Sequence, residues 1–174
     1  TWGVHYAVAR SLPRRTEPDR LRILAQRPST TVTFSPPGPS CGTLGEGQCC
    51  EGDVAGDVEI TANEPILVGH FLLAVGDPGD IGNPPGDPAM SFAIPVEQFR
   101  TEYTLLVPMQ YATSFLAVVT PAGGGVQLDG TDVGAMFASF GTGAYAAARL
   151  DVAAGAPRLS CSSGCGVEVG GYDE

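Results

Sequence analysis

The sequence contains no lysine, two histidines and one tryptophan, and aromatic residues make up only 7% of its 174 residues. All its apolar runs are far shorter than the about 20 residues that a membrane-spanning helix needs, so this stretch is not expected to cross a bilayer. Glycine and proline are abundant, with 24 and 15 residues. This composition disfavours long helices and indicates many short strands joined by turns.

Because lysine is absent, nine arginines carry all the positive charge, and the formal net charge is −10. Six of the arginines lie within the first 27 residues, and the rest of the chain is strongly acidic. An acidic chain argues against general nucleic-acid binding. The arginine-rich start could contact an anionic partner such as an acidic glycan, but a solvated loop and strand face is the favoured interpretation.

A phrase of alternating apolar residues occurs twice, at 58–71 and at 159–172. In each copy two apolar alternations flank a polar stretch, a pattern typical of a strand, a turn and a second strand. Two further pairs of similar segments follow in the same order at nearly the same spacing, namely Trp2–Val8 with Phe99–Leu105, and 21–34 with 115–128. Three pairs of similar segments that occur in the same order indicate an internal duplication of a β unit.

We therefore predict an all-β fold of two duplicated antiparallel β-sandwich-like units, with a blade-like or barrel arrangement as the structural alternative. The first unit spans residues 1–75 and the second spans residues 91–174. Residues 76–90, rich in Gly, Pro and Asp, form a connector between them. Two further β-hairpins are predicted, one over 21–34 and one that turns at Ala122–Gly125.

Five cysteines indicate disulfide bonds. Cys161 and Cys165 bracket a Ser-Ser-Gly turn, so a bond between them across the expected hairpin is plausible. Cys41 can close a small loop with either Cys50 or Cys49. A short disulfide loop contributes about 2–3 kcal/mol in the chain-entropy model. The alternatives are a zinc site, for which no standard spacing matches, and a set of free thiols; disulfides lead and imply an oxidising compartment.

The connector contains three aspartates that are weak candidates for a calcium site, Asp77, Asp80 and Asp87. Their spacing matches no EF-hand loop. Asp-Pro and Gly-Asp pairs are ordinary turn chemistry, which is the favoured reading. We therefore expect no cofactor, with calcium as the weaker alternative.

Motifs for catalysis are missing from the sequence. No Gly-x-Ser-x-Gly elbow and no His-Glu-x-x-His motif occurs, and His5 and His70 fall at different positions in the repeat. We therefore predict that the chain is not an enzyme. Six aromatic residues could form a platform that stacks on sugars, although filling of the core or its rim is the favoured role. These are Trp2, Tyr6, Tyr103, Tyr111, Tyr145 and Tyr172.

Taken together, several phrases resemble the IgG Fc-binding protein N-terminal domain family, in particular its bacterial members. In order along the chain they are TWGVHYAVAR, RILAQRPSTTVTF, CGTLGEGQCCEGDVAGDVEITANEPILVGHFL, GDPAMSFAIPVEQFRTEYTLLVP and ARLDVAAGAPRLSCSSGCGVEVGGYD. They cover most of the chain in the family's order. The combination is fairly specific, whereas any one phrase alone would be weak.

The resemblance implies a secreted or cell-surface protein with a binding or adhesive role and no known enzyme activity. Antibody binding is not carried over, because no motif for it is available to match. The family's usual cysteine pair around the first loop corresponds to Cys41 and Cys50, and Cys49 is additional. Family domains usually extend beyond both ends of this stretch, so we expect a partial chain.

From the residues and the resemblance together, we predict a non-catalytic extracellular or cell-surface binding or adhesion module that recognises a glycan or a protein. The alternatives are a carbohydrate-active enzyme domain and a purely structural spacer of a large surface protein. A cleft with two facing carboxylates would favour the enzyme. A shallow aromatic platform would favour glycan binding.

Overall fold

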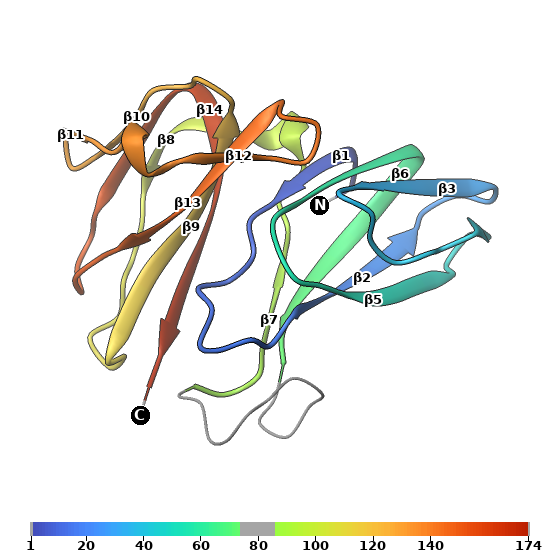
Figure 1. Ribbon diagram of the computed structural model, residues 1–174, viewed down its shortest axis with the longest axis horizontal. Helices are drawn as coiled ribbons and strands as arrows, with labels where there is room; N and C mark the ends of the chain where they lie inside the picture. Colours follow the sequence, from blue (N-terminus) through green and yellow to red (C-terminus); the bar gives the residue numbers. More distant parts are fainter. Residues whose placement is uncertain (1, 74–85, 174) are drawn as a thin grey trace.

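The computed structural model describes residues 2–73 and 86–173, and in these residues the chain is almost entirely antiparallel strand. The strands form two curled sheets that pack side by side (Figure 1). In the described part of the chain the helical segments are two short 3-10 turns, η1 (Val96–Gln98) and η2 (Gly134–Met136). No helix among these residues is long and apolar enough to span a membrane. The predicted all-β fold of two antiparallel units is confirmed.

Within residues 2–73 and 86–173, seven strands form each sheet. The first sheet contains β1 (Gly3–Val8), β2 (Asp19–Ala25), β3 (Thr30–Ser35), β4 (Thr43–Leu44), β5 (Cys49–Val54), β6 (Val58–Leu72) and β7 (Ala89–Phe92). The second contains β8 (Arg100–Thr104), β9 (Thr113–Pro121), β10 (Val126–Leu128), β11 (Thr131–Asp132), β12 (Ala138–Phe140), β13 (Tyr145–Asp151) and β14 (Arg158–Tyr172).

The two sheets share one strand order. The path β4-β3-β6-β2-β5 corresponds to β11-β10-β14-β9-β13, and β1 joins β6 as β8 joins β14. The registers agree as well, because Tyr6 lies opposite Ile60 and Tyr103 lies opposite Leu159. Each tyrosine hydroxyl then donates a 2.6 Å hydrogen bond to a carbonyl of the long strand. The similar segments Trp2–Val8 and Phe99–Leu105 thus contain strands at equivalent positions in the two sheets.

The two long strands correct the predicted turns at 58–71 and 159–172. Each segment is part of one continuous strand, β6 or β14, rather than a strand, a turn and a second strand. In β6 the polar residues at the centre bend the strand without reversing it. The Asn63 amide accepts a hydrogen bond from the Thr31 N–H (2.7 Å) and donates one to the Ser29 carbonyl (3.1 Å), so it serves a neighbouring loop.

The two other predicted hairpins are also wrong. Strands β2 and β3 do not pair with each other; both pair with β6, β3 along its first half and β2 along its second. Strands β9 and β10, on either side of Ala122–Gly125, pair with β14 in the same way. Alternation shows that a strand has one buried face, but it does not identify the strand that it pairs with.

Three apolar cores lie among the described residues. One lies within the first sheet, around Tyr6, Ile23 and Ile60, and one within the second, around Leu116 and Leu159. The third lies between the sheets, where buried side chains come from both. Its buried members are Ala7, Ala9, Phe115, Ala117, Val119, Tyr145, Ala147 and Tyr172.

Buried polar contacts add to the third core. The Arg149 guanidinium, from the second sheet, pairs with Asp57 and donates to the Arg10 carbonyl (2.7 Å). The Glu59 carboxylate accepts a 2.6 Å hydrogen bond from the Thr142 hydroxyl. Charged groups on both sides of the interface therefore have partners, which limits the cost of burying them.

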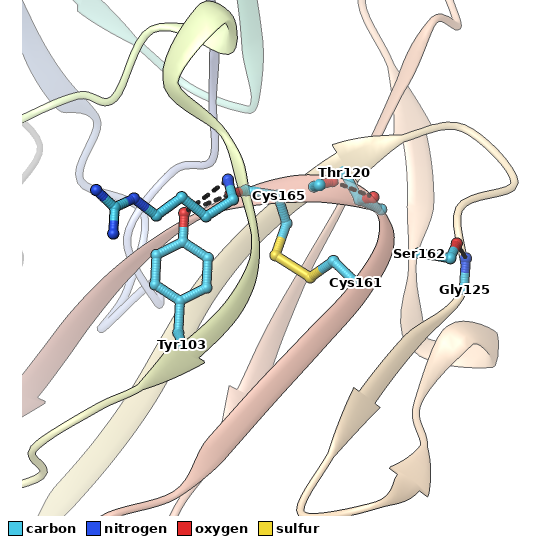
Figure 2. The surroundings of a disulfide bond; sticks show 8 residues. Tyr103, Thr120, Gly125, Cys161, Ser162 and Cys165 are labelled. Atoms are coloured by element: carbon cyan, nitrogen blue, oxygen red, sulfur yellow. Dashed lines mark hydrogen bonds between the residues drawn. A yellow bond between two sulfur atoms is a disulfide. The ribbon is translucent and has the colours of Figure 1, made fainter.

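Two disulfides are present, Cys41–Cys50 and Cys161–Cys165, and Cys49 is an exposed free thiol. The second bond spans the bend of β14, between the residues that pair with β10 and those that pair with β9 (Figure 2). The equivalent positions of β6 are Ala62 and Ile66. Ala62 pairs with Val32 as Cys161 pairs with Val126, and the carbonyls of Ile66 and Cys165 each accept the hydrogen bond of the equivalent tyrosine. A covalent bond in one sheet replaces apolar packing in the other.

The limits of the two units remain a prediction, because most of the 76–90 connector lies outside the described residues. Its last residues belong to β7, which begins at Ala89 and pairs with β6 in the first sheet. β7 therefore extends from the predicted connector into the first two residues of the predicted second unit, and it completes the first sheet.

The comparison of the two bends predicts the effect of removing the disulfide in β14. The double variant Cys161→Ala/Cys165→Ala should unfold with a free energy lower by about 2 kcal/mol, because a short loop loses its cross-link. Cys161→Ala/Cys165→Ile, which copies β6, should regain about 1 kcal/mol by filling the space. Urea denaturation by circular dichroism measures both. Equal stability of the two variants would contradict the equivalence of the bends.

Candidate functional site

A cleft of about 360 Å³ opens between the two sheets. Residues of β14 from Glu168 to Tyr172 form one wall, and residues of β7 from Ala89 to Ser91 lie opposite them. The segment between β8 and β9 adds Leu106, Pro108 and Tyr111. A concave site at the junction of two sheets is a common position for ligand binding.

Exposed apolar side chains gather around the mouth of this cleft. Met90 is 55% exposed, Leu106 77%, Tyr111 46% and Val169 41%, and all four line the cleft. Exposure of a cluster of large apolar side chains to water is unfavourable, and such clusters mark interaction surfaces. We refer to these four residues as the rim.

The floor of the cleft contains a buried histidine held between two carboxylates. His70 Nε2 lies 2.6 Å from Asp19 Oδ2, and His70 Nδ1 lies 3.1 Å from Glu168 Oε2. The Ser91 hydroxyl donates to the same Glu168 oxygen (2.8 Å), and the Ser11 N–H donates to Asp19 (2.6 Å). Since His70 and Asp19 come from the first sheet and Glu168 from the second, this network joins the sheets at the base of the cleft.

The network carries charge at neutral pH. Burial opposes protonation of the imidazole, but the hydrogen bonds to Asp19 and Glu168 outweigh it and raise the pKa of His70 to about 10. Burial also disfavours the ionised carboxyl of Asp19, yet its bonds with His70 and Ser11 hold the pKa below the usual value. His70 is therefore an imidazolium shared by two carboxylates.

This arrangement is suited to binding rather than to proton transfer. His70 is only 3% exposed and both its nitrogens are engaged, so it cannot act as a base toward a ligand. The Ser91 hydroxyl donates to Glu168. The Glu168 side chain, 26% exposed, is the charged group of the floor that a ligand can reach. It can accept hydrogen bonds from an ammonium, a guanidinium or a hydroxyl group.

The six aromatic residues considered for sugar stacking are not gathered in one place. Tyr6, Tyr145 and Tyr172 are buried, and Tyr103 is half-buried with its hydroxyl bonded to the Cys165 carbonyl (Figure 2). Trp2 and Tyr111 are exposed. Of the six, Tyr111 and Tyr172 line the cleft. The Tyr172 hydroxyl is bonded to the Leu12 carbonyl, and Tyr111 is the exposed ring at this site.

The arginine-rich start does not form an anion site. Arg20 pairs with Asp53 (2.7 Å) and Arg22 with Glu51 (2.7 Å) across neighbouring strands. Arg14 is buried and donates to the Leu73 carbonyl (2.8 Å). Internal acids and carbonyls thus pair with these cations. The favoured interpretation was a solvated loop and strand face; Arg20 and Arg22 lie on such a strand face, whereas the Arg14 side chain is buried.

The calcium candidates lie at or near the residues outside the description. Asp77 and Asp80 are among those residues, and Asp87 is exposed. Within 2–73 and 86–173, no group of three or more His, Cys, Asp or Glu side chains is placed to hold a metal ion.

Comparison with known families decides the affiliation of the chain. The sequence profile described as IgGFc binding protein matches residues 1–171. The chain belongs to this family. No curated protein and no solved structure gives a significant match.

Membership of the IgGFc binding family confirms the resemblance carried by the sequence phrases. It is a binding family, and this member has two disulfides, which fit a secreted protein. The sequence did not reveal the floor or the aliphatic part of the rim. The one available signal was a histidine within an apolar strand, His70.

The raised pKa of His70 predicts how the stability of this family member depends on pH. A histidine that is protonated more easily in the folded state stabilises the fold fully below its unfolded pKa of 6.5 and loses this contribution as the pH rises to about 10. Within this range the free energy of unfolding of the wild type, relative to His70→Gln, should fall by about 1.4 kcal/mol per pH unit. Urea denaturation at successive pH values measures the slope.

The part-exposed His5 supplies the matched control. It bonds Glu59 (2.9 Å) rather than the floor network, so His5→Gln should retain the slope of the wild type. A wild-type profile that matches that of His70→Gln between pH 6.5 and 10 would show that the imidazole is neutral in the fold.

Proposed function

We propose that the chain is an extracellular or cell-surface binding module, and that the cleft is its contact surface for a protein partner. The observation that carries this proposal is the rim of four exposed apolar side chains around a reachable carboxylate, that of Glu168. A partner side chain that enters the rim would bury apolar area, while a basic group beside it would pair with Glu168. The membership in a binding family supports the same role.

A protein fits this surface better than a glycan does. The rim consists of methionine, leucine and valine with a single tyrosine ring, whereas sugars stack on exposed aromatic faces. The charge of −10 would also attract a basic partner from a distance. A glycan is the second candidate, because Tyr111 offers an exposed ring in the same cleft as the hydrogen-bonding carboxylate of Glu168.

The repeated architecture enters the proposal as well. We infer that two copies of one β unit, at 1–75 and 91–174, gave rise to the two sheets apart from β7, since their strand orders and tyrosine registers agree. Such a module suits a large, secreted, adhesive protein whose domains provide binding surfaces. The cleft arises where the two units meet, so neither unit alone carries it.

Matched substitutions test the contact surface. Leu106→Ser and Met90→Ser remove apolar groups from the rim, and Met136→Ser removes an equally exposed methionine (56%) from η2, outside the cleft. The wild type is screened by biolayer interferometry against IgG Fc, a panel of purified extracellular proteins and a glycan array. For a protein bound by the wild type, we expect about tenfold or greater loss of affinity with each rim variant and no change with Met136→Ser.

Two results would overturn the proposal. If rim variants and the control bind the same protein equally well, the cleft is not the contact surface. If a glycan binds instead and Tyr111→Ala abolishes that binding, the glycan alternative replaces the protein partner. Circular dichroism of each variant confirms that the fold is kept.

A further inference from the structure

The two sheets differ at one edge. In the first sheet, the second half of β6 has β2 on one side and β7 on the other, since both strands pair with residues 69–72. In the second sheet, residues 166–172 of β14 pair with β9. Among the described residues no strand takes the other side, so β14 lacks the counterpart of β7. Figure 1 shows this half of β14 running toward the chain end beside β9.

The hydrogen-bonding pattern identifies the free backbone groups. On β9, the bond from Ala122 N to the Ala144 carbonyl (2.9 Å) directs the even-numbered residues toward β13 and the odd-numbered ones toward β14. The residues opposite these odd-numbered positions on β14 are the even-numbered ones from Gly166 to Tyr172. The N–H and C=O groups of Val167, Val169 and Gly171 therefore point away from β9.

The first sheet shows which residues β7 pairs with there. Ala93 N, just after β7, donates to the Val68 carbonyl (3.0 Å), so Val68, His70 and Leu72 face β7. These positions are the equivalents of Val167, Val169 and Gly171 in the alignment of β6 with β14 given by their tyrosine contacts. Two independent lines of pairing lead to the same three residues.

The cleft surrounds this edge. Side chains alternate between the two faces of a strand, so Glu168 and Tyr172 lie on one face of β14, and Val169 and Gly171 lie on the other. All four line the same cleft. A cleft that touches both faces of a strand includes the edge between them. Room for an added backbone thus exists beside Val169 and Gly171, whereas Val167 lines a small adjoining cavity with Ala93 and Ile94.

Another outer strand has features that oppose pairing with further chains. β5 carries Glu51 and Asp53, and Cys50 ties it to the preceding loop. Charges and covering loops are the usual protection of a sheet edge. The free stretch of β14 carries one charge, Glu168, together with valines and glycines, and glycine permits close approach of a second backbone.

We propose that the free edge of β14 at Val167–Gly171 is a strand-addition site, which binds an extended segment of another polypeptide antiparallel to β14. The occupant resembles β7, with small and apolar residues in alternation. The residue opposite Val169 shares its face with Gly171 and Tyr111 and is small or apolar. The residues beside it face Glu168, where a hydroxyl or a basic group is favourable. The inference rests on the proposed function, since it names the form of the partner in the same cleft.

A peptide with the sequence of residues 86–95 is the probe, because it contains a strand already known to pair at the equivalent edge. The peptide is added to the full 174-residue protein, in which the protein's own β7 is already paired with the edge of β6. Hydrogen exchange measured by NMR should show fast exchange at Val167, Val169 and Gly171 in the free protein and slowing of about tenfold or more in the peptide complex. Equivalent amides on the edge of β6, at Val68, His70 and Leu72, should be slow in both states.

Peptides methylated at single backbone nitrogens provide the control. In the β7 pairing the nitrogens of residues 89, 91 and 93 face the receiving strand, and that of residue 92 faces away. N-methylation at the Ser91 position should weaken binding by about tenfold or more, whereas N-methylation at the Phe92 position should leave it within about twofold. Equal effects of the two methyl groups would overturn strand addition. So would slow exchange at Val167, Val169 and Gly171 without peptide, or absence of peptide-induced slowing.

The rim variants separate this inference from the proposed function. If the peptide fails but Leu106→Ser still abolishes binding of a protein partner, the cleft binds proteins by side-chain contacts alone and strand addition is wrong. If the peptide adds to β14 but no partner depends on the rim, the edge is receptive and the contact surface of the proposed function lies elsewhere.

Discussion

The fold depends on two long strands, each of which pairs with different strands along its two halves. β6 pairs with β3 along its first half and with β2 along its second, and β14 does the same with β10 and β9. Because the strand bends between its two sets of partners, the sheet curls around its own apolar core. The tyrosine hydroxyl bound to the long strand near the bend, and the disulfide or the Ala62–Ile66 pair at the bend, fix its shape. The concave faces and the groove between them follow from this curvature.

Joining two curled sheets places charge in their interface. The His70 imidazolium and the carboxylates of Asp19 and Glu168 are distributed over β6, β2 and β14, so each sheet supplies part of a network that is satisfied only when both are in place. Removing one member would leave another charge buried without its partner, which costs more than the pair contributes. Because its members come from both sheets, the network fixes how the sheets meet, and it holds Glu168 at the floor of the cleft.

Much of the architecture could be predicted from the sequence, because period-two alternation and turn residues are local signals. The all-β class, the two antiparallel units and the equivalence of the two tyrosine strands came from such signals. The hairpins did not, since Asn63 and Pro65 are turn formers that here bend a continuous strand, and alternation is silent about pairing partners. The candidate site in the cleft could not be predicted from the sequence for a similar reason. His70 is separated from Asp19 by 51 residues and from Glu168 by 98. The pairing of β2 with β6 brings Asp19 to His70, and the packing of the two sheets adds Glu168.

The origin of β7 has a consequence for the order of folding. This strand completes the first sheet, yet it follows β6 in the chain by more than a dozen residues and leads directly into η1 and β8 of the second. During synthesis the first sheet cannot close its last edge until residue 92 has left the ribosome, and the next strand to emerge, β8, already belongs to the second sheet. The last strand of the first sheet is thus joined directly to the second sheet. We therefore expect the two sheets to fold and unfold as one cooperative unit rather than independently.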